Sequence, residues 1–276
     1  MVKRIIILLF VFSSAYGQGN RFAGFGYKNT CPAEALLFID SAGITNQTEK
    51  DAVCTLVKQL KDSALWTKMY AVYPLLGNAS SAKFNLKSPY SRDTSYCLTF
   101  YGGLTFSNGM VGNGTNGYAN THYNPSTTNY ADFSFGLYLG LNKDEAVVDM
   151  GTIAATTPAR GYYIQARTSN VFYVDAGDPS GTSTTNTDSR GFYCVSRTST
   201  TFAKTLKDGS LLVASTGTSA AYTGTNILIG CRDNFGTPAY FGRNNTGFAF
   251  LGKGLTDVEA VALNSIFQAF KTTLGR

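Results

Sequence analysis

The chain has 276 residues, of which 14% are charged and 13% are aromatic, and its formal net charge is +6. This composition excludes a disordered chain, which needs high charge and few aromatic residues. The Lys and Arg residues are scattered and do not form the basic face that a nucleic-acid partner requires, so we expect no nucleic-acid binding. The length suffices for one large all-β domain.

Residues 1–17 have the features of a secretory signal peptide. A basic pair at positions 3 and 4 precedes eight apolar residues at positions 5–12, and the small residues Ala15 and Gly17 mark a cleavage site before Gln18. The apolar run is too short to span a bilayer. We therefore predict a secreted or cell-surface protein; an uncleaved anchor or a buried strand is the alternative. Cleavage removes the two basic residues, so the net charge of +6 falls by 2 to +4.

Residues 18–68 are predicted to form an extended leader followed by a helical cap. The first helix covers Pro32–Ala42 and is stopped by Gly43. The second begins at Thr48 and ends near Leu65, and its apolar residues recur at helical spacing.

Residues 69–276 are predicted to form a β-sandwich. Short runs rich in aromatic and β-branched residues alternate here with clusters of Gly, Asn, Ser and Thr, which is typical of a sandwich or barrel. The expected strands are Met69–Pro74, Ala82–Leu86, Tyr96–Tyr101, Gly117–Thr121, Phe133–Leu141, Ala146–Gly151, Gly161–Thr168, Asn170–Asp175, Gly191–Arg197, Thr201–Leu206, Leu211–Ala214, Asn226–Gly230 and Thr246–Gly252.

Two local signals fix the end of the chain. Asp208-Gly209 predicts a tight hairpin, because both central residues of that turn need a positive φ. Thr256-x-x-Glu259 is a capping box that starts a final helix, whose apolar face includes Phe267 and Phe270. We expect this helix to cover an open part of the sandwich.

These C-terminal segments carry a resemblance to a known family. Gly191–Arg197, Asp208-Gly209 and Phe248-Ala-Phe-Leu-Gly-Lys-Gly-Leu-Thr-Asp-Val-Glu259, in this order, resemble the last part of concanavalin A-like (laminin-G-like) jelly rolls. Such modules occur in phage virion proteins and bacterial surface proteins. The resemblance covers roughly residues 33–275 and implies an antiparallel sandwich that binds glycans or proteins, usually without catalysis. The signal peptide departs from the phage pattern, because tailed virions assemble in the cytoplasm.

Catalytic carboxylates were sought and none is assigned. Glycosidases of this fold share an E-x-D-x-x-E strand, whereas the nearest acidic run here is Asp144-Glu145 followed by Asp149. Retaining hydrolysis needs two carboxyl groups about 5 Å apart. We therefore predict a non-enzymatic protein, and keep a hydrolase with a divergent acidic site as an alternative.

Two further motifs are expected to carry no chemistry. Gly112-x-Gly114-x-x-Gly117 matches a nucleotide-binding pattern, but a strand follows it where that pattern needs a helix. His122, the single histidine, is expected to be a partly exposed strand residue, since no nucleophile motif accompanies it.

No cofactor and no metal ligand are assigned, with calcium as an open alternative. Its oxygen ligands would come from a loop rich in polar residues and from the later pair Asp233-Asn234, but these residues lack the order of an EF-hand loop. The candidates are Asp175, Asp178, Asp188, Asp233 and Asn234.

The five cysteines are an odd number for an exported chain, so at least one is a free thiol or pairs between molecules. Their spacing matches no zinc site. The pairing of Cys31, Cys54, Cys97, Cys194 and Cys231 stays open at this point, and a Cys194–Cys231 bond is one alternative.

The sequence thus predicts an exported binding or surface-structural module for a polysaccharide or cell-surface partner. A virion structural or adhesion role and a homo-oligomer are alternatives. Sugar binding would use exposed aromatic residues, but most aromatic residues must fill the core, so no ligand-binding residue is assigned. The aromatic residues expected in loops or at strand ends are Tyr118, Tyr123, Tyr130, Tyr222, Phe235 and Tyr240.

Overall fold

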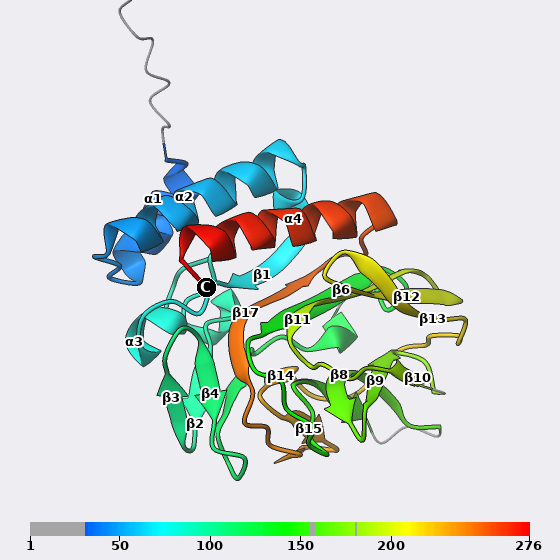
Figure 1. The fold of residues 1–276 in the computed structure, drawn as a ribbon. Helices are drawn as coiled ribbons and strands as arrows, with labels where there is room; N and C mark the ends of the chain where they lie inside the picture. The colour runs from blue at the N-terminus through cyan, green and yellow to red at the C-terminus, as the bar shows by residue number, and fades with distance from the viewer. Residues whose placement is uncertain (1–30, 128, 155–157, 180) are drawn as a thin grey trace, which may run out of the picture. The chain divides into compact units, whose positions relative to one another are not determined.

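Two β-sheets packed face to face, with helices over one of them, make up residues Cys31–Arg276 (Figure 1). The computed structural model describes residues 31–127, 129–154, 158–179 and 181–276. The predicted signal peptide (1–17) and leader (18–30) lie outside the described residues. The predicted antiparallel sandwich with N-terminal helices and a C-terminal helix is confirmed.

The first sheet has eight strands in the order β13-β12-β11-β6-β17-β4-β3, with β1 also paired to β17. Their bounds are β1 Met69–Tyr73, β3 Leu104–Phe106, β4 Met110–Gly112, β6 Phe133–Leu139, β11 Gly191–Ser199, β12 Phe202–Lys207, β13 Ser210–Ser215 and β17 Asn245–Gly252. Asp208 (φ 50°) and Gly209 (φ 80°) form the predicted tight turn between β12 and β13.

The second sheet has nine strands in the order β10-β9-β8-β7-β14-β5-β2, with the hairpin β15–β16 joined to β7. Their bounds are β2 Thr99–Tyr101, β5 Tyr118–Asn120, β7 Met150–Ala154, β8 Arg160–Thr168, β9 Val171–Ala176, β10 Thr182–Thr185, β14 Leu228–Ile229, β15 Arg232–Asn234 and β16 Thr237–Ala239. Among the described residues, all strand pairings in both sheets are antiparallel except that of β15 with β7.

The core between the sheets is rich in aromatic residues. Phe133, Phe135 and Tyr162 contact one another through ring edges and faces and are almost fully buried. Because alternate residues of a strand point to opposite faces, Tyr162 and Ile164 point into this core while Tyr163 points to the other face of the second sheet.

A second apolar core lies between the first sheet and the helices, which Figure 1 shows side by side above it. The helices are α1 Ala33–Ser41, α2 Gln47–Asp62 and α4 Asp257–Thr273. Phe267 of α4 stacks on Phe192 of β11, with ring centroids 4.7 Å apart. The predicted capping box of α4 is present, with Thr256 and Glu259 bonded to each other's backbone N–H groups.

Several element boundaries differ from the predictions. Asn46 caps α2 instead of Thr48, because its side chain reaches the N–H of Glu49. The predicted strand Ala82–Leu86 is wrong: the short helix α3 Ala79–Ala82 is followed by a loop. Its buried Asn85 holds this loop to β1 by accepting the N–H of Val72, so a side chain replaces ladder bonds there.

The remaining differences concern short elements. The predicted strand at 146–151 is shifted to β7, and β3, β4, β10, β15 and β16 were not predicted. Three short 3-10 turns lie at Trp66–Lys68, Asp93–Ser95 and Pro125–Thr127. The sandwich starts with β1 at Met69, where we placed it, but the division of the chain into a cap and a sandwich stays a prediction.

Candidate functional site

The outer face of the second sheet carries a row of aromatic side chains. Tyr101 and Tyr118 are register partners on β2 and β5, and their rings stack with centroids 4.8 Å apart. Tyr118 also contacts Phe241, 6.0 Å between centroids. Ala119, the neighbour of Tyr118 in the strand, is buried between the sheets, so the Tyr118 ring lies on the outer face.

The row continues through an arginine held between two tyrosines. The guanidinium of Arg232 lies 4.6 Å from the ring centroid of Tyr240 and 5.2 Å from that of Tyr163. Arg232 and Tyr163 reach this place because both pair with Gly151 of β7, from opposite sides of that strand. We call Tyr101, Tyr118, Phe241, Tyr240 and Tyr163 the aromatic row.

The β15–β16 hairpin positions the middle of the row. Its turn residues Phe235 and Gly236 have φ values of 58° and 92°, and the N–H of Gly236 donates to Asp233 Oδ1 at 2.7 Å. Tyr240 follows the hairpin with a φ of 61°, and its carbonyl accepts the N–H of Val148. The hairpin is thus tied to the sheet on both sides, which fixes Tyr240 beside Arg232.

The row is exposed and long. Tyr240 is 48% exposed and Tyr101 42%, and Tyr173 on β9 extends the same face with 38% exposure. The strand order from β2 to β9 contains five spacings of about 4.8 Å each, or roughly 24 Å in total. Exposed aromatic side chains over this length suit a ligand of several sugar rings, whose apolar C–H groups can pack on aromatic rings.

The structure divides the aromatic residues that we expected in loops or at strand ends. Tyr118, Phe235 and Tyr240 lie at the surface, and Tyr118 and Tyr240 belong to the aromatic row. Tyr123 and Tyr222 are core residues with 1% and 4% exposure. Tyr130 is half-buried.

The acidic residues considered for catalysis are each engaged in separate contacts. Asp144 accepts the N–H of Ser169 and pairs with Arg167 at 3.3 Å, while Glu145 pairs with Arg243 at 3.4 Å. Asp149 is buried, and its Oδ2 accepts the N–H of Ala166 at 2.8 Å.

Burial also changes the protonation of the most enclosed of these acids. Desolvation raises the pKa of Asp149 to about 7, partly opposed by the hydrogen bond from Ala166. It lies away from solvent, just before β7, where a substrate has no access.

The calcium candidates also have partners. Asp175 accepts the N–H groups of Gly161, Gly177 and Asp178, and Asp178 pairs with Arg197. Desolvation raises the pKa of Asp175 to about 8.

The other three candidates bond to neighbours in sequence. Asp188 pairs with Arg190, Asp233 accepts the N–H of Gly236, and Asn234 accepts from Arg232. Within the described ranges, no three His, Cys, Asp or Glu side chains are grouped as a metal site would require.

His122 lies after β5 and not in a strand, with a φ of 57°. Its Nε2 lies 2.8 Å from Thr99 Oγ1 and 3.4 Å from Asp93 Oδ1. A catalytic relay needs the hydroxyl and the carboxylate on different ring nitrogens, so these contacts are not those of a triad.

The glycine-rich segment forms the expected turn. Asn113 Oδ1 accepts the N–H groups of Thr115, Asn116 and Gly117, and β5 follows at Tyr118. A strand stands where a nucleotide-binding motif would place a helix.

The cysteines divide into one disulfide and three buried thiols in the described chain. Cys31 is bonded to Cys54 of α2, and Cys97, Cys194 and Cys231 are free. The Cys194–Cys231 bond that we left open is therefore not present. Burial raises the pKa of the Cys194 thiol to about 12, so this thiol stays protonated and behaves as a small apolar group.

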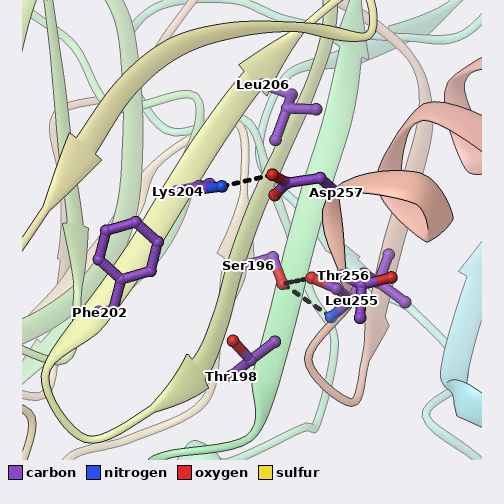
Figure 2. Close-up of a pocket in the computed structure, with 8 residues that line it drawn as sticks. All are labelled: Ser196, Thr198, Phe202, Lys204, Leu206, Leu255, Thr256 and Asp257. Atoms are coloured by element: carbon purple, nitrogen blue, oxygen red, sulfur yellow. Dashed lines mark hydrogen bonds and ion pairs between the residues drawn. The ribbon is translucent and has the colours of Figure 1, made fainter.

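A pocket lies beside the start of α4 (Figure 2). Lys204 of β12 points toward Asp257 and forms an ion pair with it, and Ser196 Oγ bonds to both backbone groups of Leu255. These polar groups bond to one another across the pocket. They link β11 and β12 to α4, and we assign them a structural role.

Comparison with known proteins shows the fold. A mutant of Trypanosoma rangeli sialidase with trans-sialidase activity is similar with a TM-score of 0.54 and 11% identity, over 79% of this chain and 39% of that one. The Trypanosoma rangeli sialidase in complex with sialic acid is similar with a TM-score of 0.51 and 11% identity, over 76% of this chain and 38% of that one. The botulinum neurotoxin serotype D binding domain is more distant, with a TM-score of 0.48 and 11% identity, over 72% of this chain and 52% of that one.

This chain therefore spans about two fifths of the sialidase and about half of the toxin fragment. No protein-family model and no curated protein sequence matches it. None of the helices described is long and apolar enough to cross a membrane. At these identities the similarity shows that the chain has a concanavalin A-like sandwich fold, and it shows nothing further.

Proposed function

We propose that this protein is an exported, non-catalytic module that binds an extended glycan along the aromatic row. The observation that carries the proposal is the row itself. Tyr101 and Tyr240 are 42% and 48% exposed on one side of a sheet, and Tyr118 stacks between Tyr101 and Phe241. A soluble protein gains nothing from such a row unless a partner covers it.

The rigidity of the row supports binding. Each tyrosine is fixed by a neighbouring ring or by the Arg232 guanidinium, and strands or a tied hairpin carry all of them. Preorganised side chains lose little conformational entropy when a ligand binds. A glycan would therefore stack on these rings with only a small ordering cost.

The absence of turnover is part of the proposal. Asp144 and Glu145 pair with arginines, and Asp149 is buried, which supports a role in binding without catalysis. The sialidases with this fold are hydrolases by name, but this chain covers under two fifths of each. We therefore do not extend their activity to this chain.

The location fits a ligand outside the cell. The Cys31–Cys54 disulfide is typical of proteins in oxidising compartments. Together with the predicted signal peptide, it supports a secreted or surface-exposed module whose partner is a polysaccharide or a glycosylated surface.

The test is a glycan array with residues 18–276, followed by a reducing-sugar assay on every glycan bound. We expect binding to at least one class of oligosaccharide or polysaccharide without release of reducing ends. Matched variants Asp144→Asn, Glu145→Gln and Asp149→Asn should bind as the unaltered protein does. Turnover that any one of these amides abolishes would replace the binding module by a hydrolase, since loss of a catalytic carboxylate lowers the rate by about 10²-fold or more.

A further inference from the structure

We infer that the glycan bound by the aromatic row is acidic, and that its sugar carboxylate binds the guanidinium of Arg232. This inference rests on the proposed function and names its ligand class. Arg232 is the cationic group in the middle of the row, with Tyr240 and Tyr163 on either side of it along the sheet.

Arg232 lacks the carboxylate partner that other arginines near this sheet possess. Arg167 of β8 pairs with Asp144 at 3.3 Å, and Arg243 pairs with Glu145 at 3.4 Å. In the part of the chain that the structure describes, no carboxylate oxygen lies within 4.0 Å of Arg232. In the described residues, the groups that face its charge are two aromatic rings and the amide oxygen of Asn234.

The guanidinium also has unused donors. It carries five N–H groups, and its one side-chain hydrogen bond among the described residues runs from Nη2 to Asn234 Oδ1 at 2.8 Å. Its Nε is buried and has no hydrogen-bond partner. Nη1 has no hydrogen bond among the described residues and is not one of their buried unpartnered atoms, so of the two terminal nitrogens Nη1 is open to a ligand while Nη2 is held by Asn234. These are the atoms that bind a carboxylate through two parallel bonds.

Packing fixes this group for a ligand. The rings on either side limit how the guanidinium can turn, and Asn234 holds one terminal nitrogen. A fixed arginine fork loses less entropy per bond than a free surface lysine would. The exposed part of Tyr240 can contact a neighbouring sugar while the fork binds the acid group.

The overall charge favours the same ligand. The net charge of +6 falls to +4 if the two basic residues of the predicted signal peptide are removed, so the chain attracts a polyanion in either form. In a polymer with one carboxylate per sugar, any sugar that lies at Arg232 brings a carboxylate to it.

The experiment measures affinity for polygalacturonate and for the same polymer with its carboxylates methyl-esterified. We expect the acidic polymer to bind at least 10-fold more tightly. Arg232→Gln should remove this difference, and Arg232→Lys should retain only part of it, because lysine keeps the charge but loses the fork. Arg243→Gln is the matched control: it removes the same charge from a 60% exposed side chain and should leave the difference unchanged.

A sialylated oligosaccharide and its desialylated form provide a second acidic source. If the protein prefers only the sialylated form over the desialylated form, the carboxylate belongs to a terminal sialic acid. If it prefers polygalacturonate over its methyl ester, the carboxylate belongs to a uronate. Either result supports the inference. Equal binding of acidic and neutral forms would overturn it while the proposed function stands. Binding to no glycan would overturn both.

If the melting curve shows that Arg232→Gln does not fold, the Arg232→Lys variant tests whether the arginine recognises the sugar carboxylate. Full acid preference in a folded Arg232→Lys variant would contradict recognition by the arginine fork. Loss of most of that preference would support it.

Discussion

Arg197 and Asp178 form an ion pair inside the sandwich, with Nη2 and Oδ2 3.1 Å apart and both side chains only 1% exposed. Arg197 Nε also donates to the carbonyl of Ala176 at 2.7 Å, and Nη1 donates to the carbonyl of Gly217 at 3.2 Å. This one side chain therefore joins the end of β9, the end of β11 and the loop that follows β13.

Replacing Asp178 by Asn should lower the free energy of unfolding by about 3–5 kcal/mol, because an arginine is then left buried without its counter-charge. Chemical denaturation measures this change. The control is Asp62→Asn, which breaks the exposed Lys58–Asp62 pair and should cost less than about 0.5 kcal/mol. Equal effects of the two variants would show that Arg197 does not depend on Asp178.

Truncating Phe267 to Ala should cost about 3–5 kcal/mol, because the ring is 1% exposed and packs against Phe192, Tyr138 and Phe248. A thermal melt measures the effect. Val258→Ala on the same helix is the control, since Val258 is 79% exposed and its loss should be within about 0.5 kcal/mol. Similar melting temperatures for the two variants would mean that α4 is not docked on the first sheet.

The buried Asp149 should make stability depend on pH. Its pKa is raised from 3.8 to about 7, so between these values the folded state binds more protons than the unfolded state. Its contribution is therefore fully present below about pH 4 and is lost as the pH rises through about 7. A shift of about three pKa units corresponds to about 4 kcal/mol at most.

The measurement is the free energy of unfolding at pH 5 and pH 8, for the unaltered protein and for Asp149→Asn. The amide cannot ionise but can still accept the N–H of Ala166. We expect the loss of stability between the two pH values to be smaller in the variant. Asp175 contributes in the same direction in both proteins, so the comparison isolates Asp149. An identical pH dependence would contradict this assignment.

Reducing the Cys31–Cys54 disulfide should lower stability by about 3 kcal/mol, because it closes a loop with a sequence separation of 23 between the start of α1 and α2. A melt with and without a thiol reductant measures this. A Cys31→Ser, Cys54→Ser double variant should melt at the reduced temperature under both conditions. A reductant effect that persists in the double variant would place the sensitive bond elsewhere.

The parts of this fold that local chemistry determines could be predicted from the sequence. The start of α4 depends on Thr256 and Glu259, which are three residues apart, and the β12–β13 turn depends on the adjacent Asp208 and Gly209. By contrast, the loop around Asn85 could not be predicted. Its conformation depends on a side-chain bond to Val72 in a different element.

The candidate site needed the tertiary structure. Tyr118 lies on the outer face because of how β5 pairs with β2, whereas Tyr123 follows β5 outside any strand and is buried against Tyr96 and Phe133. Arg232 meets Tyr163 only through the parallel pairing of β15 with β7. The turn at Asp233–Gly236, with its acidic and glycine residues, was the one sequence signal for that hairpin.

Glycan binding along the aromatic row is tested most directly by the affinity of the Tyr240→Ala variant for a glycan that the unaltered protein binds. Tyr240 is exposed, so its loss should leave the melting temperature within a few degrees of the original while weakening binding about 10-fold, or about 1.4 kcal/mol. Phe202→Ala, in the pocket beside α4, is the control and should bind as before. Undiminished binding by Tyr240→Ala together with weakened binding by Phe202→Ala would place the glycan in that pocket and contradict the role of the aromatic row.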